Sequence, residues 1–214
     1  MKRSLYKRIL FSFLLTLALP LSAQVRFGFR TGIGSSSLIQ RVEGSYVAGA
    51  RFGYNIGVVS EIAMKNGFAF RPELYFLNQG GSYRTQKYAK EVVLNPPLVK
   101  ACLYSLQLPA NFAYNIKMSD MRVSLIMGPV LDYTFKGDLT YNKDYHLASF
   151  GTEEQHDFKP FDLAFNIGLA AEHKRVFFQI NGIFGLLDRR SAPFMTESIL
   201  FQNNVSLSVG YFFY

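Results

Sequence analysis

The chain has 214 residues, a length that fits one folded domain, and it is 49% hydrophobic and 16% aromatic. Its formal net charge of +8 comes from 23 Lys and Arg against 15 Asp and Glu. Half of that excess lies in the first eight residues, so no clustered basic face, and hence no nucleic-acid partner, is expected. A single cysteine, Cys102, excludes an internal disulfide, and no Cys/His spacing suggests zinc. We therefore expect no metal and no other cofactor.

The segment Met1–Ala23 has the order of a secretory signal peptide. It begins with four basic residues, continues with the apolar run Ile9–Leu19 and ends in Leu-Ser-Ala. The apolar run is shorter than the roughly 20 residues that a membrane-spanning helix needs. Cleavage after Ala23 is expected, which leaves residues 24–214 with 19 basic and 15 acidic residues and a net charge of +4. Gln24 stands where a lipoprotein carries its acylated Cys, so no lipid anchor is expected. The alternative is a hydrophobic N-terminal helix retained in the fold.

From Val25 onward, apolar residues alternate with small or polar ones, and this period of two predicts strands. The predicted strands are 25–34, 46–57 with a continuation to 62, 68–79, 103–116, 121–133, 161–172, 176–186 and 203–214. Short turns are expected at 65–67, where Asn-Gly tolerates positive φ, and at 119–120 and 173–175. Long polar segments follow the first, third, fifth and seventh strands, at 35–45, 80–100, 136–160 and 187–198.

This alternation of short and long connections is typical of transmembrane barrels, which have short turns on the periplasmic side and long loops outside. The sequence therefore predicts an all-β fold, an eight-stranded antiparallel up-and-down transmembrane β-barrel, spanning residues 24–214 in the outer membrane. A soluble periplasmic or surface barrel, with its apolar face inside, is the alternative.

The inner face of the predicted barrel is polar and carries equal numbers of arginines and carboxylates. Because buried charges persist only when partnered, we expect these residues to form a self-neutralising network inside a barrel too narrow for a free aqueous channel. The alternative is a narrow pore or anion site at Arg30, Arg51 and Arg71. The predicted lumen charge network consists of Arg26, Arg30, Arg51, Glu61, Arg71, Glu73, Arg122, Asp132, Asp162 and Glu172.

The last twelve residues alternate strictly and resemble the closing strand of bacterial outer-membrane barrels. In a closed barrel this strand pairs with the first one, so the end of the sheet is held firmly. The alternation ends at Phe213, and Tyr214 overhangs by one residue. We expect this strand to face outer-membrane lipid and to be read by the barrel-assembly machinery through Val205, Leu207, Val209, Tyr211 and Phe213.

Several short motifs resemble the recurring strand motifs of the porin-like outer membrane protein β-barrel family of Bacteroidetes, which includes the PorT-type proteins. They are Arg71–Phe76, Gln79–Gly80, Leu106–Pro109, Met127–Pro129, Asp162–Gly168 and Gly185–Leu186. The resemblance implies an OmpA/OmpX-like architecture. As an alternative function, the resemblance implies an accessory role in type IX protein secretion, with secretion-system components as partners. The motifs are specific for the barrel and not for an activity.

A structural or binding role through the long loops 80–100 and 136–160 is the expected function, since loops of such barrels carry recognition. A lipid-modifying enzyme is the alternative, because His146 and His156 lie near Ser149, Glu153 and Asp157 in the second loop. Their spacing matches no catalytic motif. We therefore expect no catalytic residues and no enzymatic activity.

Overall fold

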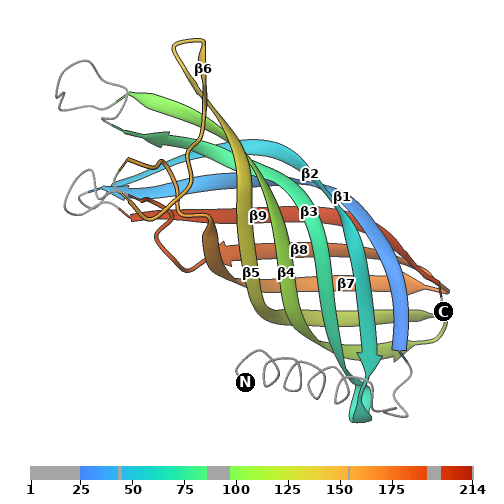
Figure 1. The fold of residues 1–214 in the computed structure, drawn as a ribbon. Coiled ribbons are helices and arrows are strands. Elements are labelled where there is room, and N and C mark those ends of the chain that lie inside the picture. The colour runs from blue at the N-terminus through green and yellow to red at the C-terminus, as the bar shows by residue number, and fades with distance from the viewer. Residues whose placement is uncertain (1–24, 43–44, 86–96, 154, 192–198, 214) are drawn as a thin grey trace, which may run out of the picture.

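The computed structural model describes residues 25–42, 45–85, 97–153, 155–191 and 199–213, and the described chain is built from antiparallel strands (Figure 1). The predicted signal peptide lies outside these residues. Within these ranges no helix has the length and apolar character that crossing a membrane requires. The elements are β1 (Val25–Val42), β2 (Ser45–Ala63), the 3₁₀ turn η1 (Lys65–Gly67), β3 (Phe68–Arg84), β4 (Leu98–Met118), β5 (Met121–Tyr141), β6 (Asp144–Leu147), β7 (Phe161–His173), β8 (Val176–Gly185) and β9 (Ile199–Phe212).

Eight of these strands form a closed ring. Their order is β4-β3-β2-β1-β9-β8-β7-β5, and pairing between β4 and β5 closes the circle. The short strand β6 folds back on the end of β5 and projects beyond the ring (Figure 1). The prediction of an eight-stranded antiparallel barrel is therefore confirmed, with β6 as an addition inside the second long loop.

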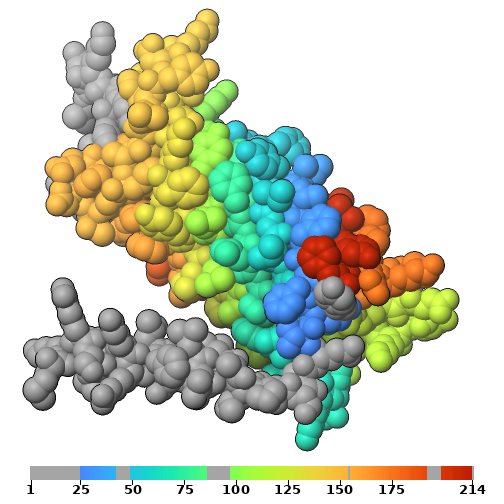
Figure 2. Space-filling view, turned by 45° about the vertical axis from the view of Figure 1, so that its right-hand side comes forward, coloured from blue at the N-terminus to red at the C-terminus, as the bar shows by residue number. Residues whose placement is uncertain are grey.

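The ring closes between the first and last strands, as predicted. Pairing of β1 with β9 runs from Gly28 opposite Phe212 to Arg41 opposite Ile199. In Figure 2 the blue residues of β1 lie against the red residues of the C-terminal strand. The outward positions of β9 are the expected ones: Val205, Leu207, Val209 and Phe213 are exposed, and Tyr211 is half-buried.

The outer wall is apolar because most of the large hydrophobic residues in the membrane-spanning part of the strands point away from the lumen. In β7, for example, Phe161, Leu163, Phe165, Ile167 and Leu169 are exposed while the alternate residues are buried. Soluble monomers rarely expose so much contiguous apolar surface, whereas lipid acyl chains cover it in a membrane barrel.

Aromatic pairs lie towards both ends of this wall. Near the short turns, the ring centroids of Phe68 and Tyr114 are 5.0 Å apart. Towards the other end, Phe76 contacts Tyr54 and Tyr104, with 6.1 Å between ring centroids in each pair. Two such bands are what the two interfaces of a bilayer favour.

The short turns follow their local sequence. Asn66 and Gly67 take φ values of 59° and 81°, as the Asn-Gly signal predicts, and Ser119 and Lys174 also have positive φ. The predicted loop 35–45 is wrong, because β1 and β2 stay paired up to Val42 opposite Ser45. The stretch is polar enough to look like a loop, yet Ser36, Leu38 and Gln40 still alternate inward, while Ile39 is the one large apolar residue among the outward positions 35, 37, 39 and 41.

The strands on one side of the barrel are longer than those on the other. Strands β1 to β5 have 17 to 21 residues, whereas β7, β8 and β9 have 13, 10 and 14. The predicted long segments 80–100 and 136–160 therefore begin and end as strand. The wall continues past the aromatic band at the loop end.

Candidate functional site

The barrel interior is the candidate site, and its end nearest the short turns holds a ring of ion pairs. Arg26 Nη2 lies 2.8 Å from Glu61 Oε1, and Arg26 Nη1 lies 2.7 Å from Glu172 Oε1. Arg122 closes the ring, because its Nη1 lies 2.9 Å from Glu61 Oε1 and its Nη2 pairs with Glu172. Two cations thus share two carboxylates, so no charge in the ring is left alone.

Three further residues extend this ring along the barrel axis. Arg71 Nη1 lies 3.7 Å from Glu61 Oε2, and its Nε lies 3.4 Å from Glu73 Oε1. Arg30 pairs with the same Glu73, and its Nη2 donates to Ser208 Oγ at 3.0 Å. Four arginines and three glutamates therefore form one network, here called the charged network, with one surplus positive charge.

The charged network joins opposite walls. Arg71 on β3 donates from Nη2 to Gln179 Oε1 on β8 over 2.6 Å, and β3 and β8 lie four positions apart in the ring of eight. Aromatic rings fill the space beside the guanidinium groups. Arg26 Cζ lies 4.0 Å from the centroid of Phe212, and Arg71 Cζ lies 4.8 Å from that of Phe177. Side chains thus span the whole lumen at this level.

A second polar group surrounds Asp132, nearer the loop end. Its Oδ2 accepts from Gln79 Nε2 at 2.8 Å and from Gln107 Nε2 at 2.5 Å. Arg189 Nη1 lies 3.4 Å from its Oδ1, and Arg189 Nη2 donates to Thr134 Oγ1 at 2.8 Å. Arg189 follows β8 and is fully buried, so the segment after β8 turns into the mouth of the barrel.

Two predicted members of the lumen charge network, Arg51 and Asp162, take no part in its ion pairs, although Asp162 is buried on the inward face of β7. Arg51 pairs with no carboxylate in the described chain, and its Nη1 donates to Asn78 Oδ1 instead. The reason is a break in the β2–β3 ladder, which has no paired residues between Gly49 opposite Ser82 and Asn55 opposite Leu77. Asp162 forms no ion pair among the described residues, and its Oδ1 accepts the backbone N–H of Leu187 at 3.3 Å.

The sequence does not indicate that Arg189 enters the lumen. It lies in a polar segment after β8, and polarity alone does not show which residue of such a segment points inward. Its role becomes clear only once the segment is placed over the mouth. Within the described part of the chain, it supplies the cation that pairs with Asp132.

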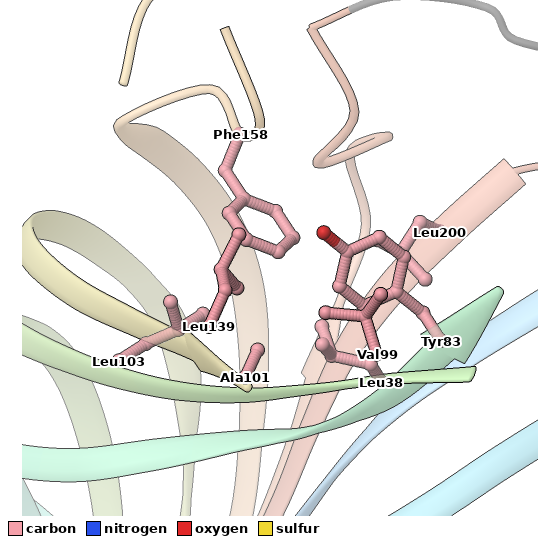
Figure 3. Packing of buried hydrophobic residues seen from close by; sticks show 8 residues of the cluster. All are labelled: Leu38, Tyr83, Val99, Ala101, Leu103, Leu139, Phe158 and Leu200. Carbon is pink, nitrogen blue, oxygen red and sulfur yellow. The ribbon is translucent and has the colours of Figure 1, made fainter. Parts of the chain in front are cut away.

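Above Asp132 the interior changes from polar to apolar. Eight buried residues form a cluster, here called the apolar plug, that comes from β1, β3, β4, β5 and β9 and from the loop after β6 (Figure 3). The loop residue Phe158 is fully buried, and its ring centroid lies 5.2 Å from that of Tyr83. The apolar plug closes the mouth and consists of Leu38, Tyr83, Val99, Ala101, Leu103, Leu139, Phe158 and Leu200.

In the described part of the second loop, polar contacts join Ser149 to Asp157 and the backbone of His156 to that of Glu153. Ser149 Oγ donates to Asp157 Oδ2 at 2.8 Å, and the same carboxylate oxygen accepts the Ser149 backbone N–H at 2.8 Å. The backbone N–H of His156 donates to Glu153 O at 3.0 Å, while His146 is exposed on β6. Among the described residues, no three His, Cys, Asp or Glu side chains gather as a metal site would require. These contacts hold the loop in shape.

The chain is similar in fold to solved structures of several bacterial proteins. Neisserial surface protein A has 7% identity and a TM-score of 0.43, with 86% of this chain and 96% of that chain covered. Ail of Yersinia pestis has 11% identity and a TM-score of 0.41, covering 87% and 98%. The N-terminal barrel of Pseudomonas aeruginosa OprF has 10% identity and a TM-score of 0.35, covering 85% and 97%. No residue role is transferred from them.

No curated protein matches the chain by sequence. The model of one protein family, described as the outer membrane protein beta-barrel domain, matches residues 19–189 and so covers the barrel from β1 to the buried Arg189. The chain belongs to this outer-membrane β-barrel family.

Proposed function

We propose that this protein is a small, non-conducting outer-membrane barrel with a structural and binding role carried by its loop end. The observation that carries the proposal is the hydrogen bond between Arg71 and Gln179 across opposite walls, with the apolar plug above it. An eight-stranded barrel leaves room only for its own side chains. Because the interior is filled, the proposed role of the barrel is binding at its outer surface.

The proposed orientation puts the short turns in the periplasm and the loops outside the cell. The short hairpins at 64–67, 119–120 and 174–175 support it, since outer-membrane barrels have short periplasmic turns. In this orientation the outward residues of β9 contact lipid, and the barrel-assembly machinery is the partner that inserts the chain.

A specific observation favours a protein-binding role. The hairpin formed by the end of β5 and by β6 stands beyond the barrel (Figure 1). On it, Tyr145 is 81% exposed to solvent and Leu147 is 77% exposed. Large apolar side chains held this far from the lipid are typical of a contact surface for a partner.

Conductance in planar bilayers tests the closed interior. The purified barrel is expected to give no ordered channel steps under conditions in which a porin reconstituted in parallel conducts. Large and regular steps would refute the closed interior and would support the narrow-pore alternative.

Crosslinking from native outer membranes tests the binding role. A crosslinkable residue at position 145 is expected to capture a discrete partner, and one placed at Phe161 on the lipid face serves as the matched control. Capture of secretion components would support the finer proposal of a PorT-type Bacteroidetes protein that serves type IX secretion. Equal labelling from both positions would contradict a specific partner.

Two further expectations can be checked by mass spectrometry. The lipid A spectrum of cells lacking the protein is expected to be unchanged, since the second loop has the contacts of a folded loop; a changed spectrum would revive the enzyme alternative. The intact mass of the membrane protein is expected to begin at Gln24, and any other start would refute cleavage after Ala23.

A further inference from the structure

The barrel wall is folded inward at one place between β2 and β3. The ladder between these strands is interrupted from Gly49 to Asn55, and β3 turns into the lumen at Gly80, whose φ is 142°. The Gly80 N–H donates to Ser36 Oγ at 2.9 Å. Next to it, a Cβ added to Gly81 would lie only 2.4 Å from Leu38 N. The chain therefore needs glycine here to approach β1 so closely.

This inward fold leaves a hollow on the outside of the wall. The hollow has a volume of about 350 Å³ and lies beside the exposed Lys100 and the half-buried Cys102, which are outward positions of β4. Its lining includes Arg51, Gly81, Ser82, Lys100, Cys102 and Thr140.

The hollow is cationic. Arg51 reaches Asn78, whose Nδ2 contacts Cys102 Sγ at 3.3 Å, so the Arg51 side chain is fixed at the hollow. In the described chain neither Arg51 nor Lys100 forms an ion pair. One carboxylate is close in the sheet, because Asp138 stands opposite Cys102. The hydroxyl groups of Ser82 and Thr140 add donors for an anion.

Aromatic rings lie directly beside this cationic hollow, on the side of the short turns. Phe76 contacts Tyr54, Tyr104 and Phe135 at centroid distances of 6.1, 6.1 and 6.2 Å. Lys136 adds a third positive charge, with Nζ 5.9 Å from the Tyr104 ring. Aromatic side chains prefer the membrane interface, so the hollow sits at the level of lipid headgroups.

We propose that the hollow binds the phosphate group of an outer-leaflet phosphorylated glycolipid, whose acyl chains lie on the aromatic rings below. Guanidinium and ammonium groups with neighbouring hydroxyls are the donors that phosphate oxygens accept from. The choice of leaflet rests on the proposed orientation with the loops outside, whereas binding itself does not depend on it.

Binding is measured on the full-length folded protein in a zwitterionic detergent, with a fluorescent, phosphorylated, multiply acylated glucosamine lipid as the probe. The double variant Arg51→Gln/Lys100→Gln is expected to weaken binding by about tenfold or more, the equivalent of one lost charge-assisted contact. Lys117→Gln, at the other end of the same strand β4, is the matched control and leaves binding unchanged. Heat-modifiable migration in gels confirms that each variant is folded.

Lys100→Gln alone keeps the test valid if the double variant fails to fold, since Lys100 is exposed; it is expected to weaken binding by several-fold. Asp138→Asn is expected to strengthen it. The dephosphorylated lipid is expected to bind as weakly as the double variant binds the probe. Equal binding of both lipids, or no effect of Lys100→Gln, would overturn the phosphate site. Displacement of the probe by inorganic phosphate at equal concentration would overturn the choice of a lipid as the ligand.

Discussion

The two ends of the barrel interior are filled in different ways. Near the short turns, the charged network joins the walls through directional ion pairs and hydrogen bonds. At the loop end, the apolar plug fills the mouth of the barrel by packing of hydrophobic side chains, and one of its members comes from a loop. The charged network depends on every partner being present. The apolar plug tolerates the loss of one side chain if the loop can move to fill the space. The comparison predicts unequal costs for similar deletions.

The largest effect is expected at the floor of the charged network. Deleting Tyr211 to Tyr214 removes Phe212, whose ring lies beneath Arg26 and Arg71, and shortens the β1–β9 pairing. We expect this deletion to abolish heat-modifiable folded protein in the outer membrane. Deleting Tyr214 alone is expected to do less damage, and equal damage from both would mean that the important contact is the final residue.

The second largest effect is expected for Glu73→Ala. Glu73 is buried and pairs with Arg30 and Arg71, so its loss leaves buried Arg30 without its carboxylate and Arg71 with only the longer contact to Glu61. Removing one side of a buried ion pair costs about 3–5 kcal/mol, which urea unfolding in lipid vesicles can measure. Glu73→Gln retains hydrogen-bonding capacity and is expected to lose less. Similar losses for both variants would show that charge is not what the site requires.

A smaller and more local effect is expected for Phe158→Ala. Burying Phe in a rigid core is worth about 3–5 kcal/mol relative to Ala, and we expect at most the lower end of this range because Phe158 lies on a loop. Limited proteolysis is expected to show faster cleavage within 142–160, and the unfolding midpoint of the barrel is expected to fall less than in Glu73→Ala. A drop in that midpoint as large as that of Glu73→Ala would remove the distinction between the two ends.

The smallest effect is expected for Arg51→Gln, which the sequence places in the lumen and the structure does not. Its contact with Asn78 involves no carboxylate, so the free energy of unfolding in urea is expected to fall by about 1.5 kcal/mol, the lower end of the range for a hydrogen bond that involves a charged group. Arg30→Gln is the matched comparison and is expected to cost more. Equal costs would place Arg51 back among the charged network.

The sequence predicts the membrane-spanning part of this barrel well, because there the two faces of each strand meet opposite environments. Phe27 and Arg26, or Leu163 and Asp162, could hardly exchange faces, so a period of two fixes both strand and orientation. The same logic pairs the last strand with the first, and it brings Arg26, Glu61, Arg122 and Glu172 to one level because their strands share a register.

Prediction fails where the outer face no longer meets lipid. Ser35 to Val42 belongs to a strand, yet it looks polar enough to be a loop. The entry of Phe158 and Arg189 depends on the path of long segments, which local sequence does not determine. The displacement of Arg51 follows from a ladder break at Gly80 and Gly81. The sequence shows these glycines, but it does not show that the strand bends inward at them.

The seam between β1 and β9 also makes completion of the barrel an event that involves the whole chain. Gly28 and Phe212 pair across almost the full length of the described protein, so this contact can form only after all the other strands exist. Contacts so distant in sequence form slowly. Until then both seam strands offer unpaired backbone groups to any neighbouring strand, which is a route to aggregation. A truncated or stalled chain therefore stays an open sheet, and closure itself distinguishes finished molecules from unfinished ones.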